Sequence, residues 1–144
     1  RTTFEGQYYQ VHDAIFEPKS IQQQDGKPHL PVVIGGSRDR MLRIIGRHAD
    51  WWDNNFSDEN EYRERVTKME AAAEKAGRDP KAIRRSTTLG AEFILSESAD
   101  TQRRKLESLR ELGITDFLFH APDDIQHLRP FVETMVPKLR EEWV

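Results

Sequence analysis

The hydrophobic pattern changes its period abruptly between residues 31 and 45. Pro31 to Ile34 is a short, unbroken apolar run rich in β-branched residues, typical of a strand buried on both faces. Gly35 and Gly36 follow, then a polar turn. Beyond it, apolar residues recur at helical spacing, at Met41, Leu42, Ile44 and Ile45. The pattern predicts a strand, a Gly-Gly turn and a helix that runs to about His48.

Before this stretch, the pattern predicts a small hairpin and a loop. Aromatic residues flank Glu5-Gly6 within residues 4–11, which indicates a turn between two short strands. Residues 15–28 contain Pro18, three glutamines and an Asp-Gly-Lys-Pro sequence, and we expect an extended loop there.

After it, strands and helices alternate. Residues 49–54 read as a strand, with Trp51 and Trp52 on opposite faces. Asp58 to Glu61 has the form of a capping box, and an apolar stripe continues the helix to Gly77, through Tyr62, Val66, Met69 and Ala73. Asp79-Pro80 can begin one further short turn.

The last third of the chain predicts two further strands and two helices. Residues 85–95 end in an apolar run and read as a strand. A helix with Leu106, Leu109 and Leu112 on one face stops at Gly113, and residues 114–120 form another strand. In the final helix, apolar residues lie at intervals of four, at Phe131, Met135 and Leu139. Pro130 suits its first turn, whereas Pro137 should kink it or shift its boundary.

This alternation predicts an α/β fold with parallel βαβ units and right-handed crossovers. The 144 residues suffice for one domain with a core, and the net charge of −3 gives no basic excess for nucleic acid. There is no cysteine for a disulfide or thiolate metal site. The short apolar runs predict neither a membrane span nor a signal peptide, so we expect a cytoplasmic protein. The chain begins with Arg1, which is compatible with a piece of a longer protein.

Candidate chemistry gathers where the predicted strands end, because parallel α/β folds bind ligands at the carboxyl ends of their strands. In chain order, the residues at these ends are Gly35, Gly36 and Ser37; Asp53, Asn54 and Asn55; Ser96 and Glu97; and His120. Strand, Gly-Gly and helix start together have the geometry of a phosphate site, with Ser37 as a helix cap or hydroxyl donor. A tight βα turn that binds nothing explains the same residues.

The remaining candidates have two interpretations each. His120 could contact substrate or cofactor or donate a proton, or be a strand-end histidine bonded to a nearby carbonyl. Trp51 and Trp52 could wall a ring-shaped ligand, or one could lie in the core and the other under a helix. We expect Asp50 and Asp53 to pair with arginines. The other histidines lack ligand spacing and predict no metal site: His12, His29, His48 and His127.

Three stretches together resemble the luciferase-like monooxygenase superfamily, and within it the deazaflavin-dependent oxidoreductases. They are residues 4–19 (Phe-Glu-Gly-Gln-Tyr-Tyr, then Glu-Pro-Lys), residues 31–36 (Pro-Val-Val-Ile-Gly-Gly) and residues 47–52 (Arg-His-Ala-Asp-Trp-Trp). Residues 112–120 also resemble that family's final strand. The resemblance spans nearly the whole chain, and the order of the motifs is more specific than any one of them.

The resemblance implies a (β/α)8 TIM barrel of which this chain is the second half, strands five to eight. Residues 1–30 would be a hairpin and loop, and residues 31–144 four βα units in a single partial domain. Typical barrels need about 250 residues.

The family implies coenzyme F420 or FMN as cofactor and a small organic substrate. Gly35 and Gly36 match the glycines whose backbone contacts the cofactor phosphate; Ser37 is a weaker match. The catalytic residues would lie in the absent half. One helix only is expected between residues 95 and 116, where family members usually have a longer stretch.

A four-stranded half barrel would leave two strand edges unpaired and interior apolar residues exposed. We therefore expect the chain to pair with its missing half or to self-associate. Alone, it would be inactive as an oxidoreductase. An alternative is a stand-alone half barrel that binds a phosphorylated ligand or a partner without catalysis, and a further one is a structural remnant with no ligand.

Overall fold

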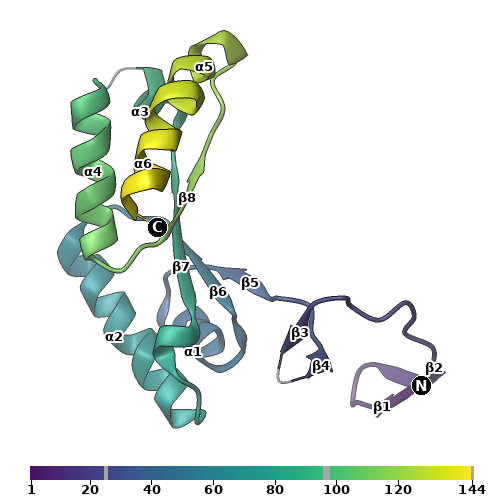
Figure 1. The fold of residues 1–144 in the computed structure, drawn as a ribbon. Helices are drawn as coiled ribbons and strands as arrows, with labels where there is room; N and C mark the ends of the chain where they lie inside the picture. The colour runs from purple at the N-terminus through teal and green to yellow at the C-terminus, as the bar shows by residue number, and fades with distance from the viewer. Residues whose placement is uncertain (25, 96–97, 144) are drawn as a thin grey trace. The chain divides into compact units, whose positions relative to one another are not determined.

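The computed structural model describes residues 1–24, 26–95 and 98–143 (Figure 1). The chain divides into two compact units, Arg1–Pro31 and Val32–Val144. The first unit contains β1 (Thr2–Glu5) and β2 (Gln10–Ala14), which pair antiparallel, and the backbone N–H of Gly6 donates to the Tyr9 carbonyl at 2.9 Å. The predicted hairpin is confirmed.

The predicted loop over residues 15–28 is wrong in one part. It contains a second, very short antiparallel pair, β3 (Gln23–Gln24) and β4 (Lys27–Pro28). Gly26 has a φ of +71°, which a tight hairpin turn accepts. Each of these strands has only two residues, too few for an alternating pattern, so no strand could be predicted there.

The second unit is built on one parallel sheet. Its strands are β5 (Val33–Gly35), β6 (Trp51–Asn54), β7 (Arg84–Leu89) and β8 (Asp116–Phe119), in the spatial order β5-β6-β7-β8. Every neighbouring pair is parallel. The mixed α/β fold with a parallel sheet is therefore confirmed.

Helices connect the strands. After β5 comes α1 (Asp39–His48), and after β6 come α2 (Glu59–Lys75) and the short turn η1 (Pro80–Ala82). Two helices lie between β7 and β8: α3 (Ala91–Leu95) and α4 (Ala99–Glu111). After β8 follow η2 (Ile125–His127), α5 (Leu128–Pro130), the π-helical segment η3 (Phe131–Met135) and α6 (Val136–Trp143). No helix of the described residues is long and apolar enough to cross a membrane.

Alternate side chains of the sheet pack against these helices. Trp52 of β6 is fully buried and stacks on Tyr62 of α2, with ring centroids 5.8 Å apart. On β8, Phe117 contacts Trp143 and Phe119 contacts Phe131. We call this the helix face of the sheet, and the opposite one the inner face. Trp51 lies on the inner face, so the prediction that the two tryptophans point in opposite directions is confirmed.

The packing of α1 on α2 depends on Gly46. A Cβ added there would lie 2.5 Å from the Met69 carbonyl oxygen and 2.8 Å from the Ala72 Cβ, so only a glycine allows this approach of the two helices. Arg78 then holds the end of α1, because its guanidinium donates to the carbonyl oxygens of Gly46 at 3.0 Å and Ala49 at 2.6 Å.

The strand predicted over residues 85–95 is wrong in its second half. β7 ends at Leu89, and residues 91–95 form α3, in which Phe93 and Ile94 are buried. A short apolar run fits a buried helical turn as well as a buried strand, and periodicity cannot separate the two. Between residues 95 and 116 the described part of the chain forms one helix, α4, as expected, and α3 precedes that stretch.

Pro137 lies inside a continuous helical run, in which α5, η3 and α6 follow one another without a break. It is the second residue of α6, where the hydrogen-bonding pattern changes from π-helical to α-helical, so the expected shift of a boundary takes the form of this change. The π-helical segment η3 precedes it, and the N–H of Val136 donates to the Phe131 carbonyl.

Candidate functional site

The Gly-Gly turn connects the end of β5 to the start of α1. Gly36 has a φ of +138°, and the helix begins two residues after Ser37 with Arg38 in extended conformation as the N-cap. The Arg38 side chain forms no capping hydrogen bond. The first-turn N–H groups of α1 therefore have no side-chain cap, and this end of the helix favours an anion.

One acidic residue lies in that first turn, and a lysine offsets its charge. Asp39 Oδ1 accepts a hydrogen bond from Lys68 Nζ of α2 at 2.8 Å. The hydrogen bond and the positive charge of Lys68 hold the pKa of Asp39 below its usual range, and Asp39 in turn raises the pKa of Lys68. The carboxylate is thus kept in an ion pair with the neighbouring helix.

A tryptophan of the next strand fixes the turn. Trp52 Nε1 donates to the Gly36 carbonyl oxygen at 2.8 Å. Because the indole is itself fully buried and stacked on Tyr62, its N–H is held in place by the core. The sequence-based alternatives for Trp52 were a ligand wall or a core residue; the structure makes it a core residue that also positions the glycine turn.

A cavity of about 200 Å³ lies beside the turn, at the carboxyl ends of β5, β6 and β7. Its lining residues are Gly35, Gly36, Ser37, Asp53, Asn54, Asn55 and Thr88. The residues predicted at the first two strand ends are therefore brought together around one cavity. Thr88 was not a candidate, because the strand that carries it was expected to continue to residue 95.

Two polar side chains of β6 are held by β7. Asp53 Oδ1 accepts from Ser86 Oγ at 2.7 Å, so the expected pairing of Asp53 with an arginine is replaced by a hydroxyl contact. Asn54 is 1% exposed, and its Nδ2 donates to the Ser86 carbonyl at 2.5 Å. Its Oδ1 has no protein partner within the described ranges. Asp50 does pair with an arginine, since Arg78 Nη2 lies 3.8 Å from its Oδ1.

The other two predicted strand-end positions do not join this cavity. Ser96 and Glu97 lie outside the described residues, and β7 ends seven residues before Ser96. His120 has an exposed side chain, and its backbone N–H donates to the Leu89 carbonyl at 2.9 Å. Within residues 1–24, 26–95 and 98–143, no three metal-ligating side chains cluster.

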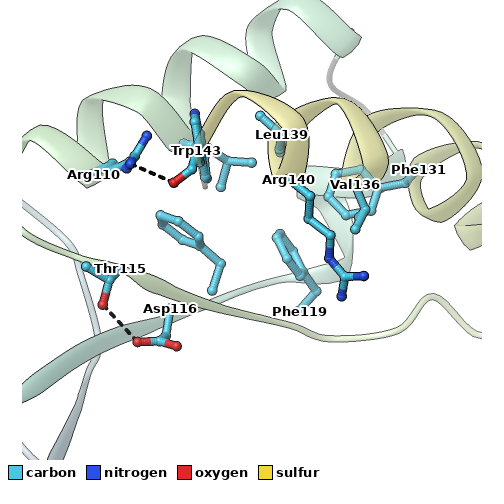
Figure 2. A pocket seen from close by; sticks show the side chains of 11 residues that line it. Arg110, Thr115, Asp116, Phe119, Phe131, Val136, Leu139, Arg140 and Trp143 are labelled. Atoms are coloured by element: carbon cyan, nitrogen blue, oxygen red, sulfur yellow. Dashed lines mark hydrogen bonds between the residues drawn. The ribbon is translucent and has the colours of Figure 1, made fainter.

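A larger hollow lies elsewhere in the second unit (Figure 2). It measures about 540 Å³ and is bounded by β8, α4 and α6, with Thr115 and Asp116 at the amino end of β8 among its lining residues. Aromatic rings dominate it: Phe117, Phe119, Phe131 and Trp143. Because it lies over the helix face and reaches the amino end of β8, it is separate from the carboxyl-end cavity.

The sequence matches the family model of luciferase-like monooxygenases over residues 1–139. This chain belongs to the luciferase-like monooxygenase family. The resemblance of its motifs to that family is thereby confirmed. No curated protein sequence matches the chain at a significant level.

Solved structures of luciferase-like barrel proteins share the fold of this family member at low identity. An F420-dependent secondary alcohol dehydrogenase, in complex with an F420–acetone adduct, is 15% identical with a TM-score of 0.73; the match covers 92% of this chain and 54% of that one. Coenzyme F420-dependent tetrahydromethanopterin reductase from Methanopyrus kandleri is 18% identical with a TM-score of 0.72, and the match covers 94% of this chain and 57% of that one. Riboflavin lyase, with modified FMN and riboflavin, is 14% identical with a TM-score of 0.75, and the match covers 100% of this chain and 49% of that one. The luciferase-like chain thus spans about half the length of these structures.

Proposed function

We propose that this chain is the C-terminal half of an F420- or FMN-dependent oxidoreductase and supplies the turn that binds the cofactor phosphate. The observation that carries the proposal is the turn itself. Gly35 ends β5 and Gly36 follows it, beside an N-terminus of α1 that has no side-chain cap, and Trp52 Nε1 donates to the Gly36 carbonyl and holds the turn in place. The F420 and FMN named for the similar structures make a phosphate-bearing cofactor the first ligand to test.

The residues present fit a phosphate group. Gly35 has only the Asp53 carbonyl oxygen, at 3.7 Å, near the position of a Cβ, so its backbone is open to a ligand. Ser37 is half-buried on the cavity wall and offers a hydroxyl donor. Backbone N–H groups, a hydroxyl and a helix N-terminus are the groups that bind a phosphate without a metal ion.

The half-barrel part of the proposal rests on strand number and length. The described residues form four parallel strands with helices on one face, and the chain spans 49–57% of the similar structures. A (β/α)8 barrel has eight strands. On this proposal, strands one to four, with the residues around the reactive ring and a small organic substrate, belong to a part of the protein outside this sequence.

The chemistry is then divided between cofactor and protein. A bound F420 or FMN supplies hydride transfer, and FMN also oxygen activation. This chain binds the phosphate end, orients the cofactor along the carboxyl ends of the strands and covers one wall of the pocket. Because the ring-facing half is absent, we expect no turnover by the chain alone.

A fluorescence titration tests the proposal. FMN and, separately, F420 are added to the purified chain, and the quenching of tryptophan emission is recorded. Of the three tryptophans, Trp52 contacts the glycine turn, whereas Trp143 lines the hollow beside α6. We expect saturable quenching by one cofactor, retained in Trp143→Phe. Quenching by neither cofactor would contradict the proposal.

A charge placed in the turn makes the test specific. Ser37→Asp puts a carboxylate at the N-terminal end of α1, where it favours the helix but repels a phosphate. We expect the dissociation constant to rise at least about tenfold, which corresponds to about 1.4 kcal/mol. Ser37→Asn is the neutral control of equal shape and should bind within about threefold of the parent. Equal affinity of the two variants would show that no anion binds at this turn.

A further inference from the structure

A groove lies between α1 and α2, the helices that follow β5 and β6 (Figure 1). It measures about 360 Å³, and four cationic side chains, one carboxylate and two alanines line it. We call it the α1–α2 groove. All its lining residues lie on these two helices, so it is distinct from the carboxyl-end cavity and includes no strand of the sheet.

The two alanines of α2 form a floor of small side chains. At Gly46 the two helices are so close that an added Cβ would lie 2.8 Å from the Ala72 Cβ. Ala72 is 9% exposed, and Ala71 beside it is exposed. Methyl groups at this position leave room for a further helix to pack at the usual interaxial distance of about 8–10 Å.

Cationic side chains flank this floor on both helices. Arg43 and Arg47 lie one helical turn apart on α1, and Lys68 and Lys75 lie about two turns apart on α2. All four residues are exposed. Long basic side chains cover apolar surface with their alkyl stems and keep their charges in water. The groove therefore combines an apolar interior with positive charge along both sides.

Most of this positive charge has no counter-charge in the chain. Lys68 pairs with Asp39. Arg43, Arg47 and Lys75 form no ion pair among the residues that the structure describes. Because the whole chain has a net charge of −3, the positive excess is local to this groove and is not a property of the composition. Three uncompensated cations around one apolar groove favour a ligand that brings its own negative charges.

We propose that the α1–α2 groove is the docking site for an acidic amphipathic helix of a partner protein. A narrow apolar stripe of the partner helix lies on Ala71 and Ala72, and Asp or Glu residues on both sides of the stripe pair with the cations of α1 and α2. Carboxylates at positions i and i+4 of a helix lie about one turn apart, which is also the spacing of Arg43 and Arg47. The inference depends neither on the cofactor nor on the half-barrel proposal.

A nucleic acid fits the groove less well than an acidic helix. Nucleic acids are bound by extended basic surfaces, whereas this groove has three uncompensated cations and contains the carboxylate of Asp39. A phosphate backbone also has no apolar surface to cover the two alanines. An acidic helix uses both the charge and the floor.

Binding of a synthetic helix is the first measurement. The probe is a fluorescein-labelled helical peptide with a stripe of Ala and Leu flanked on both sides by Glu, and fluorescence anisotropy gives its dissociation constant with the purified chain. We expect saturable binding, at least about tenfold tighter than that of a peptide with Gln in place of every Glu, and weaker binding as salt is added. Equal binding of the two peptides, or binding of neither, would overturn the inference.

Charge reversal locates the binding site. Arg43→Glu should raise the dissociation constant of the Glu peptide at least about tenfold. Arg104→Glu on α4 is the matched control, because both arginines are exposed in a helix and each follows an aspartate by four residues, Asp39 and Asp100. The control should bind within about threefold of the parent, with equal helical circular dichroism of both variants. Equal losses of affinity in the two variants would show attraction to overall charge and would overturn the assignment.

A change in the floor separates a docked helix from a bound polyanion. Ala71→Gln adds a longer polar side chain beneath the apolar stripe of the partner, leaves the charge of the groove unchanged and keeps a good helix former in α2. We expect the Glu peptide to bind at least about fivefold more weakly to this variant. Unchanged binding of the peptide by Ala71→Gln, or tighter binding of a short single-stranded RNA than of the peptide by the parent, would overturn the proposed partner.

Discussion

At the scale of single residues, the backbone conformation of Gly36 determines which substitutions the turn between β5 and α1 tolerates. With its φ of +138°, any L-residue is strained there, and an added Cβ would lie 2.6 Å from Met41 Cγ. Gly36→Ala should lower the free energy of unfolding by about 1–3 kcal/mol, measured by urea denaturation. A bulkier Gly36→Val, although it would block an anion, would not leave the fold intact, so loss of binding in that variant alone proves little.

The neighbouring glycine is the control for this prediction. Gly35 has no positive φ and no close neighbour at its Cβ position, so Gly35→Ala should change stability by less than about 1 kcal/mol. Equal losses in the two variants would mean that backbone strain at Gly36 is not what the turn depends on.

Tyr62 predicts a dependence of stability on alkaline pH. Burial raises the pKa of Tyr62 above its usual value, although the positive charge of Arg85 opposes the shift. The folded chain therefore keeps the phenol proton at pH values where the unfolded chain has lost it. This contribution to stability is complete below about pH 10 and is lost as the pH rises through the raised, folded-state pKa.

Tyr62→Phe should remove the part of the loss of stability at alkaline pH that comes from this phenol. Tyr62 Oη forms no hydrogen bond of good geometry in the described part of the chain, although Arg85 lies near it, so at pH 7 the variant should differ from the parent by less than about 1 kcal/mol. Denaturation curves at pH 7 and above pH 10 give the comparison, with Tyr8→Phe as the control because Tyr8 is 83% exposed. If the free energy of unfolding changed with pH in the same way for the parent and for Tyr62→Phe, the prediction would be wrong.

At the scale of elements, the start of α2 follows directly from its sequence. Asp58 is the N-cap, and its Oδ1 accepts from the Glu61 N–H at 3.0 Å. Half of the predicted capping box is thus formed, while the Glu61 carboxylate instead accepts from Ser57 Oγ and pairs with Arg65. Asp58→Ala should cost about 1 kcal/mol in urea denaturation, and Asp58→Ser should restore most of it. If Asp58→Ala were as stable as the parent, Asp58 would not be a stabilising cap.

Sequence periodicity worked where an element has a long amphipathic repeat and failed where it does not. The stripe of α2 and the four strand positions were predictable, because a buried face repeats every 3.6 or every two residues. α3 was missed because the five residues after Gly90, four of them apolar, carry no resolvable period. That error displaced the third strand end from Leu89 to Leu95, and Thr88 was lost as a site residue with it.

At the scale of the whole molecule, the family could be predicted and the role of single residues only in part. The order of motifs along nearly the entire chain identified the luciferase-like family, which the match over residues 1–139 confirms. The contact of Trp52 Nε1 with Gly36 joins residues 16 positions apart, and no local pattern encodes it. Residues that face the cofactor ring could not be predicted, because on the proposed half-barrel they are contributed by strands outside this sequence.

The most direct test of the central claim compares two ligands that share a ring and differ by the phosphate. FMN and riboflavin are titrated separately into the parent chain and into Ser37→Asp, with tryptophan quenching as the signal. The account predicts that FMN binds the parent at least about tenfold more tightly than riboflavin, and that Ser37→Asp removes this difference. Equal binding of FMN and riboflavin by the parent would contradict a phosphate site at Gly35, Gly36 and Ser37.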